Sequence, residues 1–215
     1  MLILGYVVIA LGAYLLGSIP TGYLVAKARG VDIRSVGSGN IGATNAFRVL
    51  GKPAGAFVLL ADGLKGFVAS AWGCSFALSL LQSAGTPLGG ADGYRILAGI
   101  AAVLGHNYTC WLHFKGGKGI ATSAGVYVAL APLAVTWAIG AWLVLFLLTR
   151  YVSVASIASA IALPTAVWLT KESVTLGIVT TGLGVLAIAK HRANIQRLMN
   201  GTENRVHFKA KSPTT

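Results

Sequence analysis

Residues 120–149 read IATSAGVYVALAPLAVTWAIGAWLVLFLLT and contain no charged side chain. A helix needs about 20 residues to cross a bilayer, so these thirty residues form either one long tilted helix or two short helices that turn near Pro132. The choice decides how many times the chain crosses the membrane, and therefore on which side each loop lies.

The distribution of basic residues distinguishes the two arrangements, because Lys and Arg tend to remain in cytoplasmic loops. A single span would place the tail from Lys190 opposite the loop that holds five basic residues between positions 27 and 52. Two helices instead bring 14 of the 17 Lys and Arg residues to one side, with Arg95 and Lys171 on the other and Lys65 within a span. We therefore predict two helices in this stretch.

The whole chain has the composition of a membrane protein. Of its 215 residues, 55% are hydrophobic and only 10% are charged, with a mean hydropathy of +0.75, whereas soluble domains carry about 25% charged residues. The apolar runs are continuous and rich in Gly and Ala, which is typical of packed membrane helices and not of the ten-residue alternation of transmembrane barrels. The other runs are 2–26, 54–83, 95–112, 152–170 and 174–190.

These runs predict an all-α, polytopic transmembrane helical bundle of about seven helices, with the N-terminus outside and the C-terminus cytoplasmic. The first run starts at Leu2 without a basic region before it, so we interpret it as a membrane span and not as a cleaved signal peptide. We expect residues 1–190 to form the membrane domain. Residues 191–215 then form a basic cytoplasmic segment that completes the functional site.

The net charge of +12 would suggest nucleic-acid binding in a soluble protein, but here the basic residues lie between and beyond the apolar runs. This placement indicates membrane orientation and anion binding, so no nucleic-acid partner is predicted, and no obligate protein partner. The two cysteines, Cys74 and Cys110, form no Cys-x-x-Cys motif, acidic residues are scarce and the histidines are scattered. We expect neither a metal site nor a cofactor.

Three polar segments interrupt this apolar chain on the predicted cytoplasmic side. The first, residues 37–45, reads GSGNIGATN and is followed by Arg48. Glycine-rich backbone and helix N-termini expose N–H groups that attract phosphate, and Arg48 adds a bidentate phosphate donor. Ser38 and Arg48 are ten residues apart, so both reach one ligand only if the segment begins outside a helix. Close helix packing through small residues is the alternative. The other candidate ligand-binding residues here are Gly39, Asn40, Thr44 and Asn45.

The second segment follows Gly105-His106 and reads FKGGKGIAT over residues 114–122. Two lysines among three glycines at the start of an apolar helix form a compact anion nest. The pattern is not a Walker A motif, because Gly119 follows Lys118 where Ser or Thr is required. The alternative is that the lysines only mark a cytoplasmic boundary. The candidate residues are Lys115, Gly116, Gly117, Lys118 and Gly119.

The third segment, residues 190–198, reads KHRANIQRL and leads to Glu203 and Arg205. On a continuous helix His191, Asn194 and Arg205 would lie near one face, and histidine exchanges protons near neutral pH. A basic tail that binds anionic lipid headgroups is the alternative.

Asp62 and Lys65 lie three residues apart within the apolar run 54–83, on one helical face where they can pair. Charges inside a membrane are costly, so they usually face the protein interior and mark function. A purely architectural ion pair is the alternative.

Together and in this order, the three segments and the Asp62-x-x-Lys65-Gly66 element resemble the bacterial acyl-phosphate:glycerol-3-phosphate acyltransferase family. The resemblance spans essentially the whole chain. It departs from the family at Thr109, where many members have proline, which puts the shape of the loop entrance in doubt.

The resemblance implies an integral enzyme of the bacterial inner membrane with its active site on the cytoplasmic side. Such an enzyme moves a fatty acyl group from acyl-phosphate to the 1-hydroxyl of glycerol 3-phosphate, giving lysophosphatidate and phosphate. It implies catalytic roles for Ser38, Arg48, His191 and Asn194, a glycerol-phosphate loop at 115–119, and a structural role for Glu203. We also expect Asp62 and Lys65 to be structural.

The residues present suit that chemistry. Acyl-phosphate is already activated, so the site must supply positioning and charge stabilisation and no acyl-enzyme. The hydroxyl proton would pass either to His191 or to a substrate phosphate oxygen, and the sequence leaves both open. Two other classes compete: a small transporter for phosphorylated metabolites, which would favour internal repeats and midplane binding groups, and a scaffold protein that binds membrane lipids through its basic tail.

Overall fold

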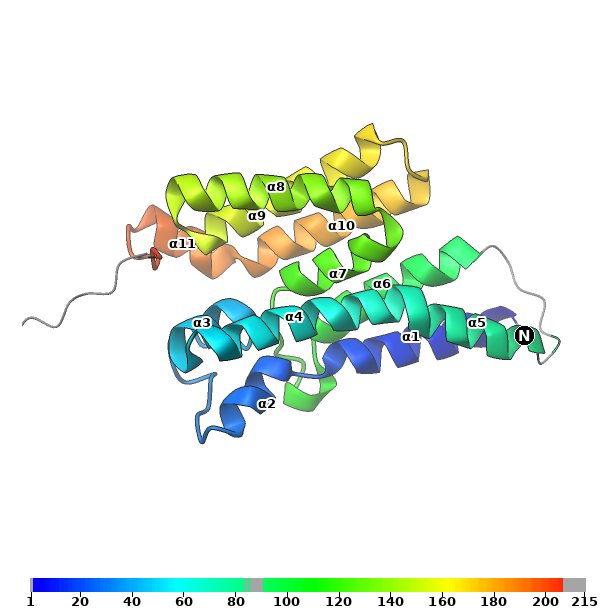
Figure 1. The fold of residues 1–215 in the computed structure, drawn as a ribbon, viewed down its shortest axis with the longest axis horizontal. Coiled ribbons are helices and arrows are strands. Elements are labelled where there is room, and N and C mark those ends of the chain that lie inside the picture. Colours follow the sequence, from blue (N-terminus) through cyan, green and yellow to red (C-terminus); the bar gives the residue numbers. More distant parts are fainter. Residues whose placement is uncertain (1, 84, 86–90, 207–215) are drawn as a thin grey trace, which may run out of the picture. The chain divides into compact units, whose positions relative to one another are not determined.

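The computed structural model describes residues 2–83, 85 and 91–206 of the chain. Every regular element in these residues is helical (Figure 1), which confirms the predicted all-α class. The elements are α1 Leu2–Ser18, α2 Thr21–Lys27, α3 Ala43–Leu50, α4 Lys52–Val68, the π-helical turn η1 Ala69–Gly73, α5 Cys74–Ser83, α6 Ala91–Asn107, the 3-10 turn η2 Cys110–Leu112, α7 Ile120–Leu130, α8 Pro132–Thr149, α9 Val152–Leu169, α10 Val174–Lys190 and α11 Arg192–Met199.

Several helices are long and apolar enough to cross a membrane. Four segments in the described residues meet that requirement, and a fifth does so if the pair Val174–Lys190 and Arg192–Met199, bent by 51°, is one span. The four are Ile3–Lys27, Lys52–Trp72, Pro132–Thr149 and Val152–Leu169. These spans support a multi-pass membrane protein, whereas the count of about seven helices and the orientation of the termini stay predictions.

The stretch 120–149 forms two helices, as its charge context predicts. Ala131 separates α7 from α8 and has an extended backbone, with φ −150° and ψ 72°. Proline disfavours the helical conformation in the residue before it and is well accepted in the first turn of a helix, so Pro132 ends α7 and starts α8. The two helices differ in length, however. The 11 residues of α7 rise about 16 Å, but the 18 residues of α8 suffice for a span, so the expectation of two short helices is wrong for α8.

The chain divides into two compact units, Met1–Pro132 and Leu133–Thr215, called unit 1 and unit 2 below. Each unit is described by itself. The division into a membrane domain, residues 1–190, and a basic segment that completes the site, residues 191–215, stays a prediction.

In unit 1, α1 and α6 run parallel. Near their starts, the rings of Tyr6 and Tyr94 stack with centroids 4.1 Å apart, and near their ends the Ser18 hydroxyl donates to the Gly105 carbonyl at 3.3 Å. The two helices therefore finish at the same end of the unit.

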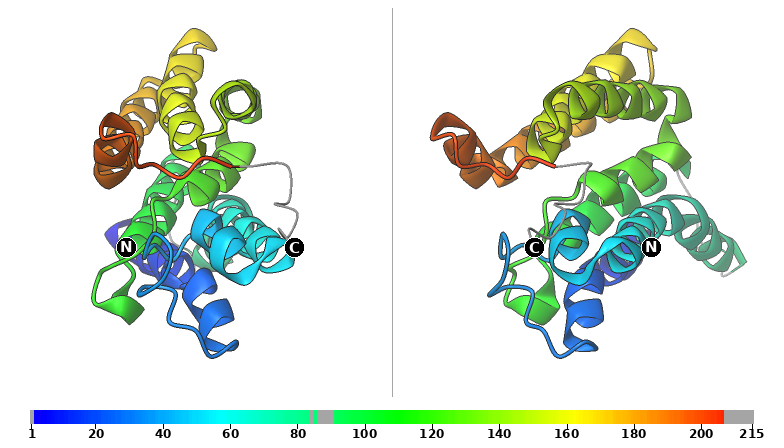
Figure 2. Two further views of the ribbon diagram at one scale, coloured as in Figure 1. Left: turned by 90° about the vertical axis from the view of Figure 1, so that its left-hand side faces the viewer. Right: turned by 60° about the vertical axis from the view of Figure 1, so that its left-hand side comes forward.

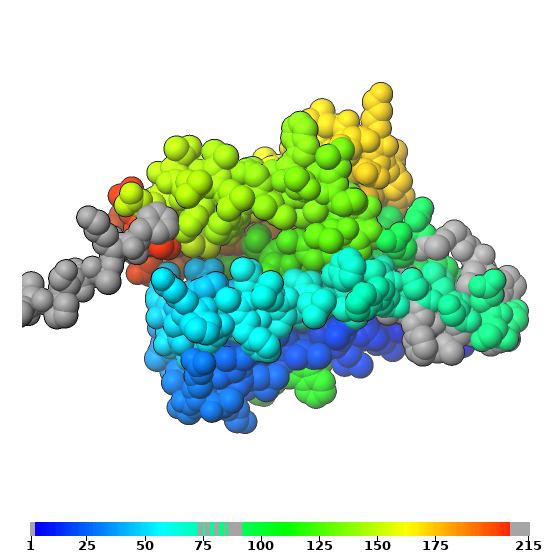
Figure 3. Space-filling view, in the orientation of Figure 1, coloured from blue at the N-terminus to red at the C-terminus, as the bar shows by residue number. Residues whose placement is uncertain are grey.

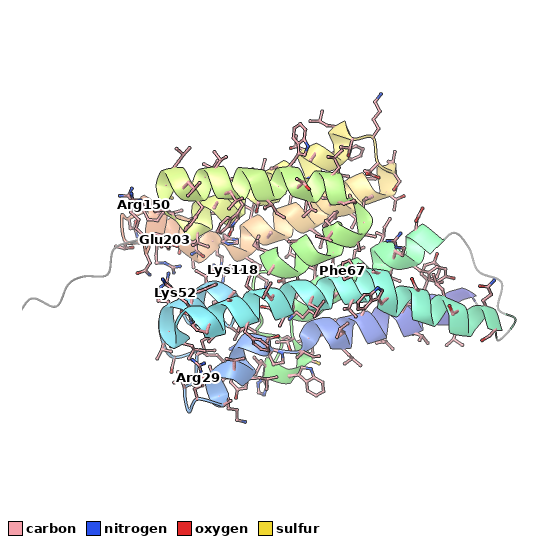
Figure 4. All side chains as sticks on the ribbon, viewed as in Figure 1. Arg29, Lys52, Phe67, Lys118, Arg150 and Glu203 are labelled. Carbon is pink, nitrogen blue, oxygen red and sulfur yellow. The ribbon has the colours of Figure 1, made fainter. Side chains whose placement is uncertain are left out.

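The helices α4 and α7 also run parallel, with Gly63 beside Ala121 and Phe67 beside Gly125. They run opposite to α1 (Figure 1), and the Lys65 ammonium of α4 donates to the carbonyl of Ile19 at 3.0 Å, just after α1 ends. The end of unit 1 where α1 and α6 finish and α4 and α7 begin is called the loop end. Figure 4 shows Lys52 at this end and Phe67 farther along α4.

The contact between α4 and α7 depends on glycine. A Cβ atom on buried Gly125 would overlap the backbone carbonyl of Gly63, whereas one on Gly140 in α8 would meet nothing within 4 Å. We expect Gly125→Ala to lower the free energy of unfolding by about 1–3 kcal/mol, since backbone must move to make room. Thermal unfolding in detergent measures this, with Gly140→Ala as the control. Equal midpoints for the two variants would contradict the close contact.

The opposite face of α4 is apolar and exposed. Phe57, Leu60 and Leu64 are 58%, 71% and 56% exposed, and their spacing places them on one side of the helix. Figure 3 shows α4, in cyan, at the surface of the molecule. In a chain of this composition, such a face suits contact with lipid tails.

Unit 2 contains α8 to α11, and α9 and α10 lie side by side in both views of Figure 2. The Trp168 indole donates to the Thr181 hydroxyl between them at 3.1 Å. After α11 the chain returns to the turn between α8 and α9, where the Val206 N–H donates to the Arg150 carbonyl at 2.9 Å. The third polar segment therefore lies at the end of unit 2 that also holds Arg150.

Candidate functional site

The first polar segment forms an irregular loop followed by the short helix α3. Gly42 is the N-cap of α3 in an extended conformation, so the segment has the non-helical start that Ser38 and Arg48 need to reach one ligand. Ser38, Gly39, Thr44 and Arg48 are exposed. Thr44 and Arg48 are four residues apart on α3 and share a face, which presents a hydroxyl and a guanidinium to the surroundings.

Asn45 holds this loop together from inside. Its amide nitrogen lies 3.2 Å, 3.1 Å and 3.0 Å from the carbonyls of Ile33, Val36 and Asn40, and its amide oxygen accepts from the Ser38 N–H at 2.9 Å. The Asn40 side chain in turn accepts from the Gly42 N–H at 2.9 Å. Asn45 is 1% exposed, so this geometry favours a role in shaping the loop over direct contact with a ligand.

The second polar segment folds back onto the end of α6. The Gly116 and Gly117 N–H groups donate to the carbonyls of Asn107 and His106 at 3.2 Å and 2.9 Å. Gly119 has φ +80° and starts α7, a conformation that favours glycine. Lys115 is exposed and Lys118 half-buried, so the loop offers both cations at its surface.

The Thr109 hydroxyl holds the entrance of this loop through two hydrogen bonds. Its hydroxyl donates to the Ser18 carbonyl at the end of α1 and accepts from the Trp111 N–H at 3.3 Å. A proline here would supply neither bond, because it has no hydroxyl. The hydroxyl of Thr109 therefore determines how the entrance is held.

Unit 1 brings the first two polar segments together. Residues around the first segment share one buried apolar cluster with Leu112, which lies in the loop before the second. The cluster consists of Ala26, Ile33, Ile41, Ala46, Val58 and Leu112. Both segments therefore lie at the loop end of unit 1.

The third segment lies in unit 2, where His191 joins α10 to α11. Its Nδ1 lies 2.8 Å from the Ala187 carbonyl, and only a protonated Nδ1 can donate to that oxygen. In the neutral ring Nε2 therefore carries the lone pair, which is the arrangement that a general base needs.

Glu203 organises the residues after His191. The Asn194 amide and the Arg197 guanidinium donate to its two carboxylate oxygens, each at 2.7 Å. Arg205 is not on the same helix as His191, because α11 ends at Met199. It donates instead to the Thr149 carbonyl at 3.2 Å, and the expectation that one helical face holds His191, Asn194 and Arg205 is wrong for Arg205.

The carboxyl of Glu203 is held in its ionised form. Burial raises its pKa, but the bonds from Asn194 and Arg197 outweigh burial and hold the pKa below the usual 4.5. A lowered pKa stabilises the fold above the unfolded-state pKa, and that contribution is lost as pH falls below about 4.5.

We therefore expect Glu203→Gln to cost about 2 kcal/mol at pH 7, since it replaces two charge-assisted bonds. The cost should shrink as the pH approaches 4. Thermal unfolding of both proteins between pH 7 and pH 4 measures the difference, with Glu172→Gln as a control in unit 2. A cost that does not depend on pH would contradict the ionised state.

Comparison with known proteins bears directly on these segments. Residues 7–201 match the family model described as "Glycerol-3-phosphate acyltransferase". The glycerol-3-phosphate acyltransferases of Geobacter metallireducens and Geobacter sulfurreducens are 50% and 47% identical over 199 and 198 residues, covering 93% and 92% of this chain and 95% of each relative. The chain belongs to the glycerol-3-phosphate acyltransferase family.

Two solved structures of glycerol 3-phosphate acyltransferases are also similar to this chain. The glycerol 3-phosphate form of PlsY, an integral membrane glycerol 3-phosphate acyltransferase, is 39% identical with a TM-score of 0.83, and 94% of this chain and 96% of that chain are covered. Its lysophosphatidic acid form is 38% identical with a TM-score of 0.80, and 94% of this chain and 95% of that chain are covered.

In this acyltransferase, the buried charges of α4 meet His106, which the sequence places before the second polar segment but does not link to Asp62. Asp62 and Lys65 form the ion pair that their spacing predicts, with 2.8 Å between Nζ and Oδ1. His106 of α6 joins them, with its Nδ1 3.6 Å from the same oxygen of Asp62. No local signal reveals this contact, because 44 residues separate Asp62 and His106 and only the packing of α4 and α6 brings them together.

A second ion pair lies in the loop before the first segment of the acyltransferase. The Arg34 side chain donates to both oxygens of Asp32 at 2.9 Å and 2.8 Å. This bidentate bond lowers the pKa of Asp32 to about 2. Arg34 also lies over the Tyr23 ring, 4.9 Å from its centroid, so its charge is already engaged within the loop.

Proposed function

We propose that this membrane acyltransferase moves a fatty acyl group from acyl-phosphate to the 1-hydroxyl of glycerol 3-phosphate. The bond that forms joins the glycerol oxygen to the acyl carbon, and the bond that breaks joins that carbon to the phosphate oxygen. Lysophosphatidate and inorganic phosphate are the products. The transporter and scaffold alternatives lose their support, because the chain belongs to a family of acyltransferases.

The observation that carries the proposal is the meeting of the first two polar segments at the loop end of unit 1. Both substrates bear phosphate, and the exposed Arg48 together with Lys115 and Lys118 supplies three cations for two phosphate groups. Exposed Ser38 adds a hydroxyl at the same end. Fixed donors of this kind stabilise charge that develops at a phosphate leaving group.

The roles of the individual residues follow from this arrangement. Arg48 and the loop 115–119 bind the phosphate groups, and Ser38 orients the reacting carbonyl or hydroxyl. Asn40 and Asn45 keep the first loop in shape, Thr44 contributes a further hydroxyl, and Asn194 positions the third segment through Glu203.

The proton of the attacking hydroxyl needs an acceptor. Nε2 of His191 is one candidate acceptor, and a substrate phosphate oxygen is the other. The acceptor decides whether the rate depends on the ionisation of the protein or of the substrate.

We also propose that the protein lies in the bacterial inner membrane with the site on the cytoplasmic side. The basic residues support this orientation, because 14 of the 17 Lys and Arg residues lie in the loops and tail on the side predicted to face the cytoplasm.

Turnover by the purified protein in detergent tests the reaction. With acyl-phosphate and glycerol 3-phosphate present, phosphate and lysophosphatidate should appear in equal amounts, and omission of either substrate should abolish lysophosphatidate. Acyl-CoA in place of acyl-phosphate serves as the control for the donor. Equal turnover with acyl-CoA would contradict the proposed donor, and no lysophosphatidate with either donor would contradict the proposed reaction.

A further inference from the structure

The proposed reaction gives no role to three polar side chains buried within unit 1. Asp62, Lys65 and His106 are 2%, 6% and 6% exposed, and they lie between the apolar helices α4 and α6. Desolvation of such groups is costly. Lys65 balances the charge of Asp62 and also donates to the Ile19 carbonyl between α1 and α2, but neither contact explains His106.

His106 lies between this ion pair and the Gly-Lys loop. On one side its Nδ1 faces the Asp62 carboxylate at 3.6 Å. On the other side the Nε2 edge of the ring packs directly against Gly117, where a Cβ atom would overlap it. The backbone carbonyl of the same residue accepts from the Gly117 N–H at 2.9 Å. One residue therefore contacts Gly117 through both its side chain and its backbone.

A carboxylate beside a histidine could also form a catalytic dyad, in which the carboxylate orients a ring that takes up a proton. The geometry here opposes that role. A base must reach the substrate, yet the Nε2 edge is covered by Gly117 and the ring is buried. The pair therefore faces the loop backbone and not an exposed surface.

We propose that Asp62 and His106 are positioning residues that hold the backbone of residues 115–119 in the conformation that binds the phosphate of glycerol 3-phosphate. The inference rests on the proposed function, in which this loop binds that phosphate. Asp62 fixes the orientation of the His106 ring, and the ring packs against Gly117 and keeps it in place. A displaced loop backbone weakens phosphate binding without altering the reacting groups.

Two substitutions distinguish whether the His106 side chain holds the loop through its polar contact or only fills space. His106→Leu keeps a bulky side chain but loses the polar contact with Asp62, whereas His106→Asn keeps a donor where Nδ1 lies. Ser70→Ala is the matched control, because Ser70 is also polar and fully buried in unit 1 but lies in η1, away from the loop. Thermal unfolding in detergent reports whether each variant folds.

The measurements are KM for each substrate, kcat and hydrogen exchange at the Gly116 and Gly117 amides of the full chain. His106→Leu should raise KM for glycerol 3-phosphate about tenfold or more, with kcat within about threefold and KM for acyl-phosphate unchanged. His106→Asn should recover part of the loss. Exchange at both amides should accelerate in His106→Leu and stay unchanged in Ser70→Ala.

Unchanged KM for glycerol 3-phosphate together with unchanged exchange in both His106 variants would overturn the inference. An equal rise in KM for both substrates, or loss of an ionisation from the pH profile with KM intact, would also overturn it, because these results indicate general distortion or a catalytic base. Should the wild-type protein lack turnover, the proposed function fails, and the exchange rates still decide whether His106 supports the loop.

Discussion

Arg48→Ala is expected to lower kcat/KM for acyl transfer by about 100-fold to 1000-fold. The guanidinium of Arg48 is exposed on the face of α3 that also carries Thr44, where it can bind a phosphate through two N–H groups. Removal of one fixed donor from a site that stabilises developing charge costs about 3–4 kcal/mol. Arg48→Lys should recover only part of the activity, because an ammonium cannot reproduce the planar pair of donors.

Steady-state kinetics in detergent measure this effect, with Lys52→Ala as the matched control. Lys52 is also basic and exposed and lies four residues from Arg48 at the same end of unit 1 (Figure 4). The control should retain activity within about threefold, since exposed surface charges without a specific contact contribute little. Equal losses for the two variants would show that general positive charge, and not a specific contact, supports the reaction.

His191→Ala is expected to lower kcat/KM by about 100-fold to 10,000-fold if Nε2 accepts the hydroxyl proton. The bond between Nδ1 and the Ala187 carbonyl keeps the lone pair on Nε2. As pH falls and the ring is protonated, a base loses its function, so wild-type kcat/KM should decline on the acidic side of neutrality. This decline should be absent in the variant.

The pH profile of kcat/KM for both proteins is the decisive measurement. His113→Asn is the control, because His113 is exposed and has φ +52°, a conformation that asparagine accepts. Its profile should match that of the wild type. If His191→Ala keeps the acidic decline of the wild type, the proton passes to a substrate phosphate oxygen and His191 only orients a reactant.

The long apolar helices follow from the sequence because each of their runs has a local signal. Apolar runs of membrane length predict the spans, and Pro132 predicts the break between α7 and α8 through its effect on the preceding residue. The unequal lengths of these helices were not predicted, because proline marks a boundary and says little about how far the helix extends beyond it. The three polar segments were also visible, since polar residues are rare in so apolar a chain.

The contacts that shape the site could not be predicted from the sequence. Asn45 resembles a ligand-binding residue in the sequence, but the fold surrounds its amide with carbonyls of its own loop. His106 reaches Asp62 only through the packing of two helices. Arg205 leaves the helical face expected for it because α11 ends at Met199 and Gly201 follows with φ +69°, a termination that spacing alone does not reveal.

Labelling from each side of the membrane tests most directly whether the second and third polar segments face the same side. Single cysteines replace Lys115 or Arg192, both exposed, in a protein without Cys74 and Cys110. A thiol reagent that cannot cross membranes should label both positions in inside-out vesicles and neither in right-side-out vesicles, with Lys171→Cys as the control labelled in the opposite pattern. If Lys115→Cys and Arg192→Cys are labelled from opposite sides, the Gly-Lys loop and His191 cannot act on the same substrates, and the proposed site is wrong.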